Sequence, residues 1–209
     1  NAMPVEFKLN GKDVVARGGE TIIQTAKRHG VEIPHLCYME GMRPDGNCRA
    51  CVVEVKGERV LAASCCRKPV KGMEVITDNE RARHSQKMVL ELLLSDMPKE
   101  RHTLASELDQ WAAKLEVGKP RFAPRHQPGA DLSHYGIAVN LDSCIQCTRC
   151  LRACREEQVN DVIGYAFRGE HSKIVFDLDD PMGESTCVAC GECVEACPTG
   201  ALMPARDVG

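Results

Sequence analysis

The sequence predicts an α+β protein made of successive parts, and three observations lead to this prediction. β-prone runs alternate with turn residues near the N-terminus, an apolar helical pattern follows, and the C-terminal part contains two matching runs of cysteine. We expect a sheet domain at 3–78, a helical linker domain at 79–116, an extended connector at 117–136 and a cysteine-rich domain at 137–209.

The N-terminal part begins with a predicted hairpin. Residues 5–9 and 13–16 are β-prone and are joined by Asn10-Gly11, a dipeptide favoured in two-residue hairpin turns. Thr21 can cap a following helix, which Gly30 would end. Strand, strand, helix and then a cysteine loop is the opening of a β-grasp fold, and we expect the sheet to be completed by strands at 52–56, 59–63 and 74–77.

A first group of four cysteines follows this predicted helix, with the spacing C-x10-C-x2-C-x13-C. Its members are Cys37, Cys48, Cys51 and Cys65. Gly41 and Gly46 lie in the same loop and would let backbone N–H groups approach inorganic sulfide closely. We therefore expect a [2Fe–2S] site, with a zinc site as the alternative.

The fourth ligand of this group is ambiguous, because two cysteines are adjacent in the chain. Cys65 and Cys66 cannot both bind without strain. The spacing favours Cys65 as the ligand and leaves Cys66 as a thiol that is either buried or beside the cluster ligands.

The middle of the chain has helical periodicity. Asn79 can cap a helix over 79–94, and apolar residues at helical spacing predict a second helix over 103–115. We expect these two helices to pack as a pair. The stretch 118–131 contains three prolines and reads as an extended connector.

The C-terminal part contains the strongest signal, since the spacing C-x2-C-x2-C-x3-C occurs twice. The first run is Cys144, Cys147, Cys150 and Cys154, and the second run is Cys187, Cys190, Cys193 and Cys197, followed by Pro198. This is the spacing of bacterial-type ferredoxins with two [4Fe–4S] cubanes, in which the fourth cysteine of each run binds the cluster of the other run. We expect one cubane on Cys144, Cys147, Cys150 and Cys197, and the other on Cys187, Cys190, Cys193 and Cys154.

The spacing also predicts the local structure of this part. A short helix after each loop would carry its fourth cysteine back to the other cluster, and Pro198 would end the second helix. A hairpin is expected at 162–167 and 173–177, around Arg168-Gly169. Zinc is again the alternative metal, although a zinc knuckle gains nothing from a third C-x2 step.

Composition excludes several classes of function. The net charge of −3 gives no reason to expect nucleic acid as a partner, and no apolar run is long enough to span a membrane. Thirteen cysteines cannot all pair as internal disulfides, so a reducing cytoplasm is the expected location. Asn1 and Ala2 precede Met3 and look like a remnant of an expression tag.

Charged residues differ between the two tandem runs. Arg149, Arg152 and Arg155 surround the first run, whereas Glu184, Glu192 and Glu195 surround the second. Net charge near a cluster shifts its reduction potential. These residues favour a higher potential for the first-run cubane, unless solvent screens their charges.

The order of these motifs resembles a known family. It is similar to the N-terminal region shared by the large iron–sulfur subunit of complex I, [FeFe]-hydrogenases and the α subunit of NAD-dependent formate dehydrogenases that contain molybdenum or tungsten. Nearly the whole chain is covered, and the closest likeness is to the formate dehydrogenase α subunit, in the stretches PHLCYMEGMRPDGNCRACVVEVKGERVLAASCC, CIQCTRCLRACREEQVNDVIGYAFRGEHSKIVFD and STCVACGECVEACPTGALMPAR.

The resemblance implies a role as an electron relay with no catalytic residues of its own. Electrons from formate, released at a molybdopterin active site absent from this chain, would pass through the clusters towards a flavin subunit that reduces NAD. The implied partners are the molybdopterin domain or subunit and the flavin- and NAD-reducing iron–sulfur subunits. The equivalent segment of a hydrogenase or of a complex I-like dehydrogenase is the first alternative, and a zinc-stapled interaction scaffold is the second.

The chain departs from that family in two places. Many relatives carry a further [4Fe–4S] site with one histidine and three cysteine ligands, but here Met97, Arg101, Leu104 and Gln110 stand at those positions, with His102 one residue out of register. We expect that cluster to be absent. The chain also stops at Gly209, before the family's catalytic domains, so we expect either a fragment or a stand-alone electron-transfer subunit.

Overall fold

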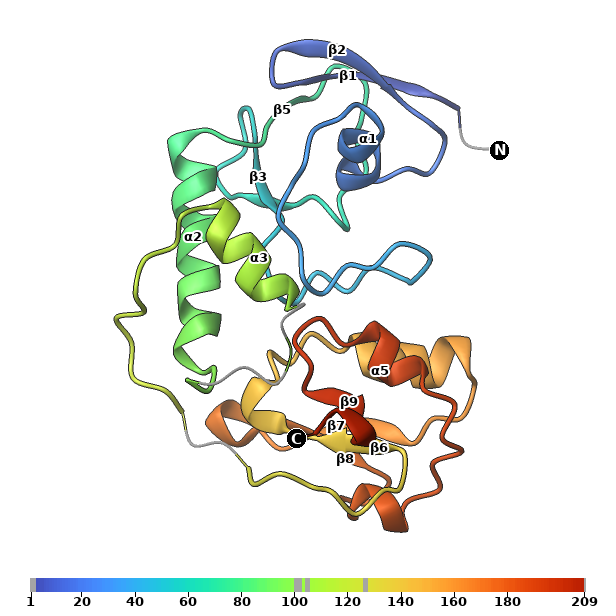
Figure 1. Cartoon of the computed structure of the whole chain (residues 1–209). Coiled ribbons are helices and arrows are strands. Elements are labelled where there is room, and N and C mark those ends of the chain that lie inside the picture. The colour runs from blue at the N-terminus through green and yellow to red at the C-terminus, as the bar shows by residue number, and fades with distance from the viewer. Residues whose placement is uncertain (1–2, 100–102, 104–105, 126–127, 209) are drawn as a thin grey trace. The chain divides into compact units, whose positions relative to one another are not determined.

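The computed structural model describes residues 3–99, 103, 106–125 and 128–208, and it divides into two compact units (Figure 1). Unit 1 consists of Asn1–Tyr38 and Pro44–Leu90, and unit 2 of Met39–Arg43 and Glu91–Gly209. The short segment Met39–Arg43 belongs to unit 2, although it lies between Cys37 and Cys48 in the sequence.

Unit 1 opens with the predicted hairpin. Strands β1 (Val5–Leu9) and β2 (Lys12–Ala16) pair antiparallel along their whole length. Asn10 and Gly11 have φ values of 49° and 78°, as a tight turn with two positive φ angles requires. The structure confirms this part of the prediction.

The hairpin belongs to a mixed five-stranded sheet with the order β2-β1-β5-β3-β4. The added strands are β3 (Val52–Val55), β4 (Ala62–Ala63) and β5 (Glu74–Ile76), and β5 runs parallel to β1. Strand β4 is shorter than the predicted run at 59–63. The carbonyl of Arg59 accepts a hydrogen bond from the Arg81 side chain, so this residue is held outside the strand.

Helix α1 (Ile22–Arg28) covers the sheet with its apolar face. Ile22, Ile23 and Ala26 are buried in one core with residues of the sheet. The backbone N–H of Thr21 donates to Oε1 of Gln24 at 2.9 Å, which caps the helix, and Gly30 follows its end with φ 74°. The start and the end of the helix are as predicted.

Helix α2 (Glu80–Ser95) starts at the predicted cap. Oδ1 of Asn79 accepts from the Ala82 N–H at 2.9 Å. Gln86, which is buried, donates to the carbonyls of Val52 and Thr77 and so ties the first half of the helix to unit 1.

The next helix, which lies in unit 2, is shorter than predicted. Helix α3 (Glu107–Lys114) has Ser106 as its cap, and Leu108 and Ala112 are buried. Residues 100–102 and 104–105 lie outside the described part of the chain, so Arg101, His102 and Leu104 of the lost cluster motif are not placed. The packing of α2 and α3 as a pair stays a prediction.

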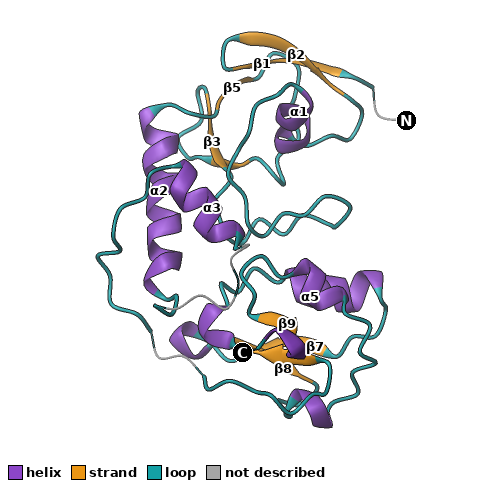
Figure 2. Ribbon diagram, viewed as in Figure 1, coloured by secondary structure: helices purple, strands orange, loops and turns teal. Residues whose placement is uncertain are grey.

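The rest of unit 2 consists of short helices and two small sheets joined by long loops (Figure 2). Strand β6 (Ile137–Val139) pairs with β9 (Leu202–Pro204), and β7 (Ile163–Ala166) pairs with β8 (Lys173–Phe176). The β7–β8 hairpin confirms the prediction, whereas β9 was not predicted. In the described ranges, no helix has the length and apolar character that crossing a membrane requires.

The predicted helices after each cysteine loop are present. Helix α4 (Arg149–Arg152) continues into a π-helical turn, Ala153–Glu157, which contains Cys154. Helix α5 (Glu192–Ala196) stops directly before Cys197 and Pro198. Cys150, Cys154 and Cys193 form part of the apolar core with residues such as Ile163 and Leu202.

Glu20 provides a test of what stabilises unit 1. Arg28 donates to both of its carboxylate oxygens, at 3.1 and 2.8 Å, and these bonds lower the pKa of Glu20 to about 2. The stability that comes from a lowered pKa is present above the pKa of the unfolded chain and is lost as the pH falls towards the folded value.

We expect Glu20→Gln to destabilise unit 1 by about 1–2 kcal/mol, because a charge-assisted pair becomes a neutral contact. Thermal unfolding at pH 7 and pH 5 measures this, and the difference from the unaltered protein stays the same at both values, since Glu20 is ionised at each. The exposed Glu6 supplies the control, Glu6→Gln. An equal effect of both substitutions contradicts the expectation.

Candidate metal centres

The first cysteine group converges within unit 1. Cys37, Cys51 and Cys65 are buried, and Cys48 is partly buried. The Cys37 N–H donates to Sγ of Cys48 at 3.4 Å, so the two ends of the long loop meet.

Cys66 has a different environment from Cys65. Its side chain is exposed, whereas Cys65 is fully buried, and their sulfurs are 3.6 Å apart. Gly46 packs against this thiol, because a Cβ at position 46 would lie 2.8 Å from Sγ of Cys66. Gly46 also has a φ of 68°, so both its space and its backbone favour glycine.

The thiols of this group act on one another. Hydrogen bonds from Cys48 and Cys65 hold the pKa of Cys37 far below its usual range, to about 2. The same bonds raise the pKa of the two donors, while Cys65 lowers the pKa of Cys51 to about 7. A cationic group is therefore needed to ionise all four thiols together, and iron in a cluster supplies such a charge.

The tandem runs form two cavities in unit 2. The cysteines that line one cavity are Cys144, Cys147, Cys150 and Cys197. The cysteines that line the other are Cys154, Cys187, Cys190 and Cys193. Each cavity thus receives three cysteines of one run and the last cysteine of the other, which is the grouping that the spacing predicts.

The two loops that surround these cavities have the same backbone form. Gln146 and Thr148 have positive φ in the first loop, and Ala189 and Gly191 have positive φ at the equivalent positions of the second. The N–H of Gln146 lies 3.4 Å from Sγ of Cys144, and that of Ala189 lies 3.4 Å from Sγ of Cys187. Such loops turn backbone N–H groups inwards and form concavities that bind anions.

Burial favours the neutral form of several of these thiols in the absence of a cation. It raises the pKa of Cys144 to about 11 and that of Cys193 to about 12, and it raises the pKa of Cys150 well above its usual value. Buried thiols become thiolates when a metal displaces their protons. Four cysteines around each cavity, with inward N–H groups, therefore fit a [4Fe–4S] cluster.

In the described part of the chain, no three His, Cys, Asp or Glu side chains converge on a position suited to a single metal ion. Nδ1 of His35 lies 2.8 Å from the Ile33 carbonyl oxygen, and its ring packs edge-on against Tyr38.

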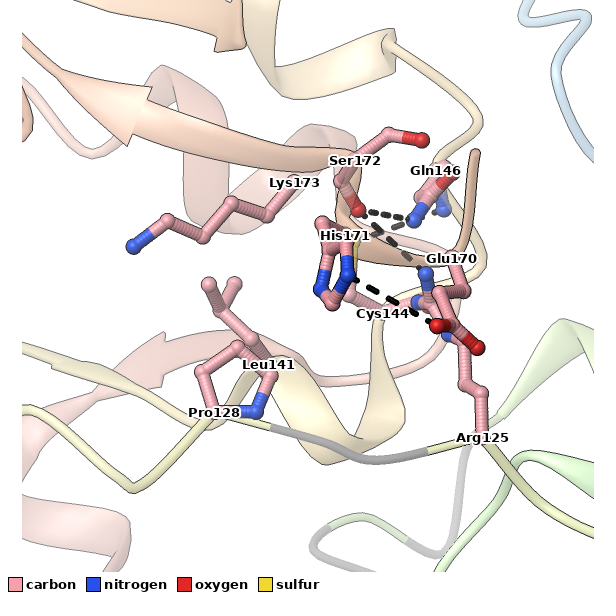
Figure 3. Close-up of a pocket in the computed structure, with 9 residues that line it drawn as sticks. All are labelled: Arg125, Pro128, Leu141, Cys144, Gln146, Glu170, His171, Ser172 and Lys173. Atoms are coloured by element: carbon pink, nitrogen blue, oxygen red, sulfur yellow. Dashed lines mark hydrogen bonds and ion pairs between the residues drawn. The ribbon is translucent and has the colours of Figure 1, made fainter. Parts of the chain in front are cut away.

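Sequence reasoning missed one basic residue beside the first cavity. Arg125 lies in the proline-rich connector, and its Nη2 donates to the Cys144 carbonyl at 3.3 Å while its Nη1 donates to the Ser172 carbonyl (Figure 3). These residues line a separate surface pocket with Gln146, His171 and Lys173. Nothing in the local sequence marks Arg125 as a neighbour of a cysteine that follows it by nineteen positions.

Comparisons with known proteins identify both domains. Residues 2–80 match the model of the 2Fe-2S iron-sulfur cluster binding domain, and residues 143–201 match that of the 4Fe-4S dicluster domain. The chain therefore combines a [2Fe–2S] ferredoxin domain with a [4Fe–4S] dicluster domain, and its iron–sulfur character is confirmed.

Curated relatives of two kinds resemble the chain. It is 35% identical to the NADP-reducing hydrogenase subunit HndD of Solidesulfovibrio fructosivorans, over 93% of this chain and 35% of the relative. It is 29% identical to a putative formate dehydrogenase of Staphylococcus haemolyticus, over 96% of this chain and 21% of the relative. The chain thus spans about a third or less of the length of these relatives.

A solved structure resembles nearly the whole chain. A chain in the crystal structure of an NAD⁺-reducing [NiFe]-hydrogenase in the H₂-reduced state matches with a TM-score of 0.88 and 26% identity, over 96% of this chain and 87% of that one. The chain is therefore similar both to hydrogenase components and to formate dehydrogenases. The resemblance is not restricted to formate dehydrogenases.

Proposed function

We propose that this chain is an electron relay with one [2Fe–2S] and two [4Fe–4S] clusters, working between a catalytic module and a subunit that reduces NAD or NADP. The observation that carries the proposal is the exchange of last cysteines between the two cavities of unit 2. The exchange places Cys154 with the second run and Cys197 with the first.

The proposed ligands are the cysteines that these sites bring together. They are Cys37, Cys48, Cys51 and Cys65 for the [2Fe–2S] cluster, Cys144, Cys147, Cys150 and Cys197 for one cubane, and Cys154, Cys187, Cys190 and Cys193 for the other. Zinc in the same positions is the alternative.

The chain's own residues would bury and position these groups. A bound iron–sulfur cluster supplies one-electron oxidation and reduction. The exchanged cysteines fix the two cubane sites at one separation, because the cysteine pairs Cys150 and Cys154, and Cys193 and Cys197, are each joined by a single helical segment. Inward N–H groups of the loops stabilise the anionic cluster, and apolar neighbours such as Ile163 and Leu202 exclude water.

For the catalytic module, the first candidate is a molybdopterin formate dehydrogenase. The alignment with a putative formate dehydrogenase extends over 96% of this chain. The segment at 97–110 also lacks the histidine and cysteines of the additional cluster, with Met97 and Gln110 in two of those positions. We propose the reducing cytoplasm as the location, which suits exposed thiols such as Cys66.

A hydrogenase is the second candidate, and two observations favour it. The sequence identity with the hydrogenase subunit HndD is higher, at 35%, and the solved structure with a TM-score of 0.88 comes from an NAD⁺-reducing hydrogenase. In this case hydrogen oxidation would replace formate oxidation, and the relay would keep the same partners on the NAD(P) side.

Iron and sulfide analysis tests the relay itself. We expect about ten iron atoms per chain after anaerobic isolation, since one [2Fe–2S] and two [4Fe–4S] clusters are proposed. EPR spectra of the reduced protein are expected to show one [2Fe–2S] signal and two [4Fe–4S] signals. About six iron atoms per chain, or stoichiometric zinc, would falsify the proposed cluster set.

The adjacent cysteines Cys65 and Cys66 form a matched pair for testing the [2Fe–2S] ligands. We expect Cys65→Ser to alter or abolish the [2Fe–2S] EPR signal, because the buried sulfur faces Cys37 and Cys51. Cys66→Ser leaves the signal and the iron content unchanged, because its side chain is exposed. The opposite result would make Cys66 the ligand.

The native complex separates the two candidate modules. We expect the complex purified through a tag on this chain to reduce NAD⁺ or NADP⁺ with formate and to contain molybdenum or tungsten. If the complex reduces NAD⁺ or NADP⁺ with hydrogen gas but not with formate, and contains nickel or a [FeFe] centre, the catalytic module is a hydrogenase and not a formate dehydrogenase. Activity with neither donor would contradict both modules.

A further inference from the structure

The two cysteine runs carry opposite charges at matching positions. When Cys144 is aligned with Cys187, every cysteine of one run meets a cysteine of the other. In this register Arg149 corresponds to Glu192, and Arg152 corresponds to Glu195. The residue before and the residue two after the third cysteine are thus both basic in the first run and both acidic in the second.

Burial makes this difference larger than the sequence alone suggests. Arg152 is 1% exposed and Arg149 is 4% exposed. Glu192 and Glu195 are both exposed on α5. Solvent and salt screen exposed charges strongly but screen buried charges much less. The matching positions therefore differ in the effective strength of their charges as well as in sign.

The buried guanidinium group of Arg152 is hydrogen-bonded to a residue that lines the first cavity. Nη2 of Arg152 donates to the carbonyl of Cys147 at 3.3 Å, and Nη1 donates to the carbonyl of Arg43 at 2.5 Å. Cys147 lines the first cavity, so Arg152 is bonded directly to its wall.

Arg149 lies three residues before Arg152 in α4 and has different partners. Its Nη1 contacts both carboxylate oxygens of Glu107, at 3.0 and 2.8 Å, and its Nη2 lies 3.4 Å from Sδ of Met39. Glu107 offsets part of its charge, and Arg149 is for this reason a poorer test residue than Arg152.

A second arginine, from outside the cysteine run, hydrogen-bonds to a residue that lines the same cavity. Arg125 donates to the carbonyl of Cys144, another residue of the cavity wall (Figure 3). The first cavity thus receives guanidinium hydrogen bonds at the carbonyls of two of its four cysteines, in keeping with a site built to hold negative charge.

We infer that Arg152, supported by Arg149, gives the first-run cubane a higher reduction potential than the second-run cubane, so that the relay has a fixed electron order. The inference rests on the proposed function. Gaining one electron makes a thiolate-bound cubane more negative by one unit, and a buried cation beside it stabilises that form. Arg152 would act by its charge on the cubane's reduction potential, as a positioning residue that takes no part in making or breaking bonds.

The redox step balances as a single electron transfer. One electron would leave the second-run cubane, which is initially reduced and becomes oxidised. The electron would enter the first-run cubane, which is initially oxidised and becomes reduced, and no proton would be transferred. In the isolated chain dithionite supplies the electron; in the complex the catalytic module supplies it.

The unaltered full chain tests the order directly. Anaerobic protein with its clusters is titrated with dithionite in steps and followed by EPR, and Cys190→Ser, which changes a second-run cysteine alone, assigns the two cubane signals. We expect the first-run signal to appear first. The order does not change between about 0.01 M and about 1 M salt, because the arginines are buried.

Substitutions at the matched positions test the cause. We expect Arg152→Gln to lower the first-run midpoint so that the ratio of reduced to oxidised cubane at a fixed potential falls about tenfold, which is 59 mV for one electron. Arg152→Lys keeps the charge and restores most of the midpoint. Glu195→Gln changes the second-run midpoint by less than Arg152→Gln changes the first.

The failures of the two proposals are distinguishable. If iron and sulfide analysis finds no [4Fe–4S] clusters, the proposed function fails. If the clusters are present but the second-run cubane is reduced first, or Arg152→Gln with full iron content leaves the midpoint unchanged, the inference fails and the relay stands. If Arg152→Gln loses iron, the reduction order of the unaltered chain and the Arg152→Lys midpoint decide the question.

Discussion

The constraint on which unit 2 depends is that cysteines from two separate runs must share two cavities. Its regular elements are short: α4 has four residues, α5 has five, and both sheets have two strands. Elements of this size are not stable alone in water. Cys150, Cys154 and Cys193 instead belong to the apolar core. Burial raises the pKa of Cys150 and Cys193, so these interior thiols become thiolates only with a cation present, which couples folding to cluster binding.

Local chemistry explains which parts of the fold could be predicted. Asn10-Gly11 specifies a tight turn, and Thr21 with Gln24 caps α1, because each needs contacts only a few residues away. The shortening of β4 depends instead on Arg81. Its side chain donates a hydrogen bond to the carbonyl of Arg59, although the two residues are 22 positions apart in the sequence. Strand β9 was missed because it has three residues and ends in Pro204, which weakens any strand signal.

The candidate sites show the same division. Spacing alone predicted which cysteines share a cavity, because a repeated three-residue step leaves few geometries for four ligands. It could not find Arg125 in the connector, nor the contacts of Met39 and Arg43 with the arginines of α4, since no periodicity links these positions. The choice between formate dehydrogenase and hydrogenase is a different case: the matched region covers 35% of the hydrogenase subunit and 21% of the putative formate dehydrogenase, and both resemble the chain over more than 90% of its length.

The two tandem cysteine runs have the same spacing, so the ligands alone do not determine in which order electrons would reach the two cubane sites. The residues between the cysteines differ between the runs. Two cubane sites with the same spacing, the same positive-φ positions and the same N–H contacts to sulfur would give electrons no preferred site. The sequence shows opposite charges at the matched positions, but it does not show which of them water screens. Burial of Arg149 and Arg152, against exposure of Glu192 and Glu195, decides this in favour of the arginines. In the proposed relay, a duplicated ligand pattern would therefore supply the electron path, and the burial of a few unduplicated side chains would set its direction.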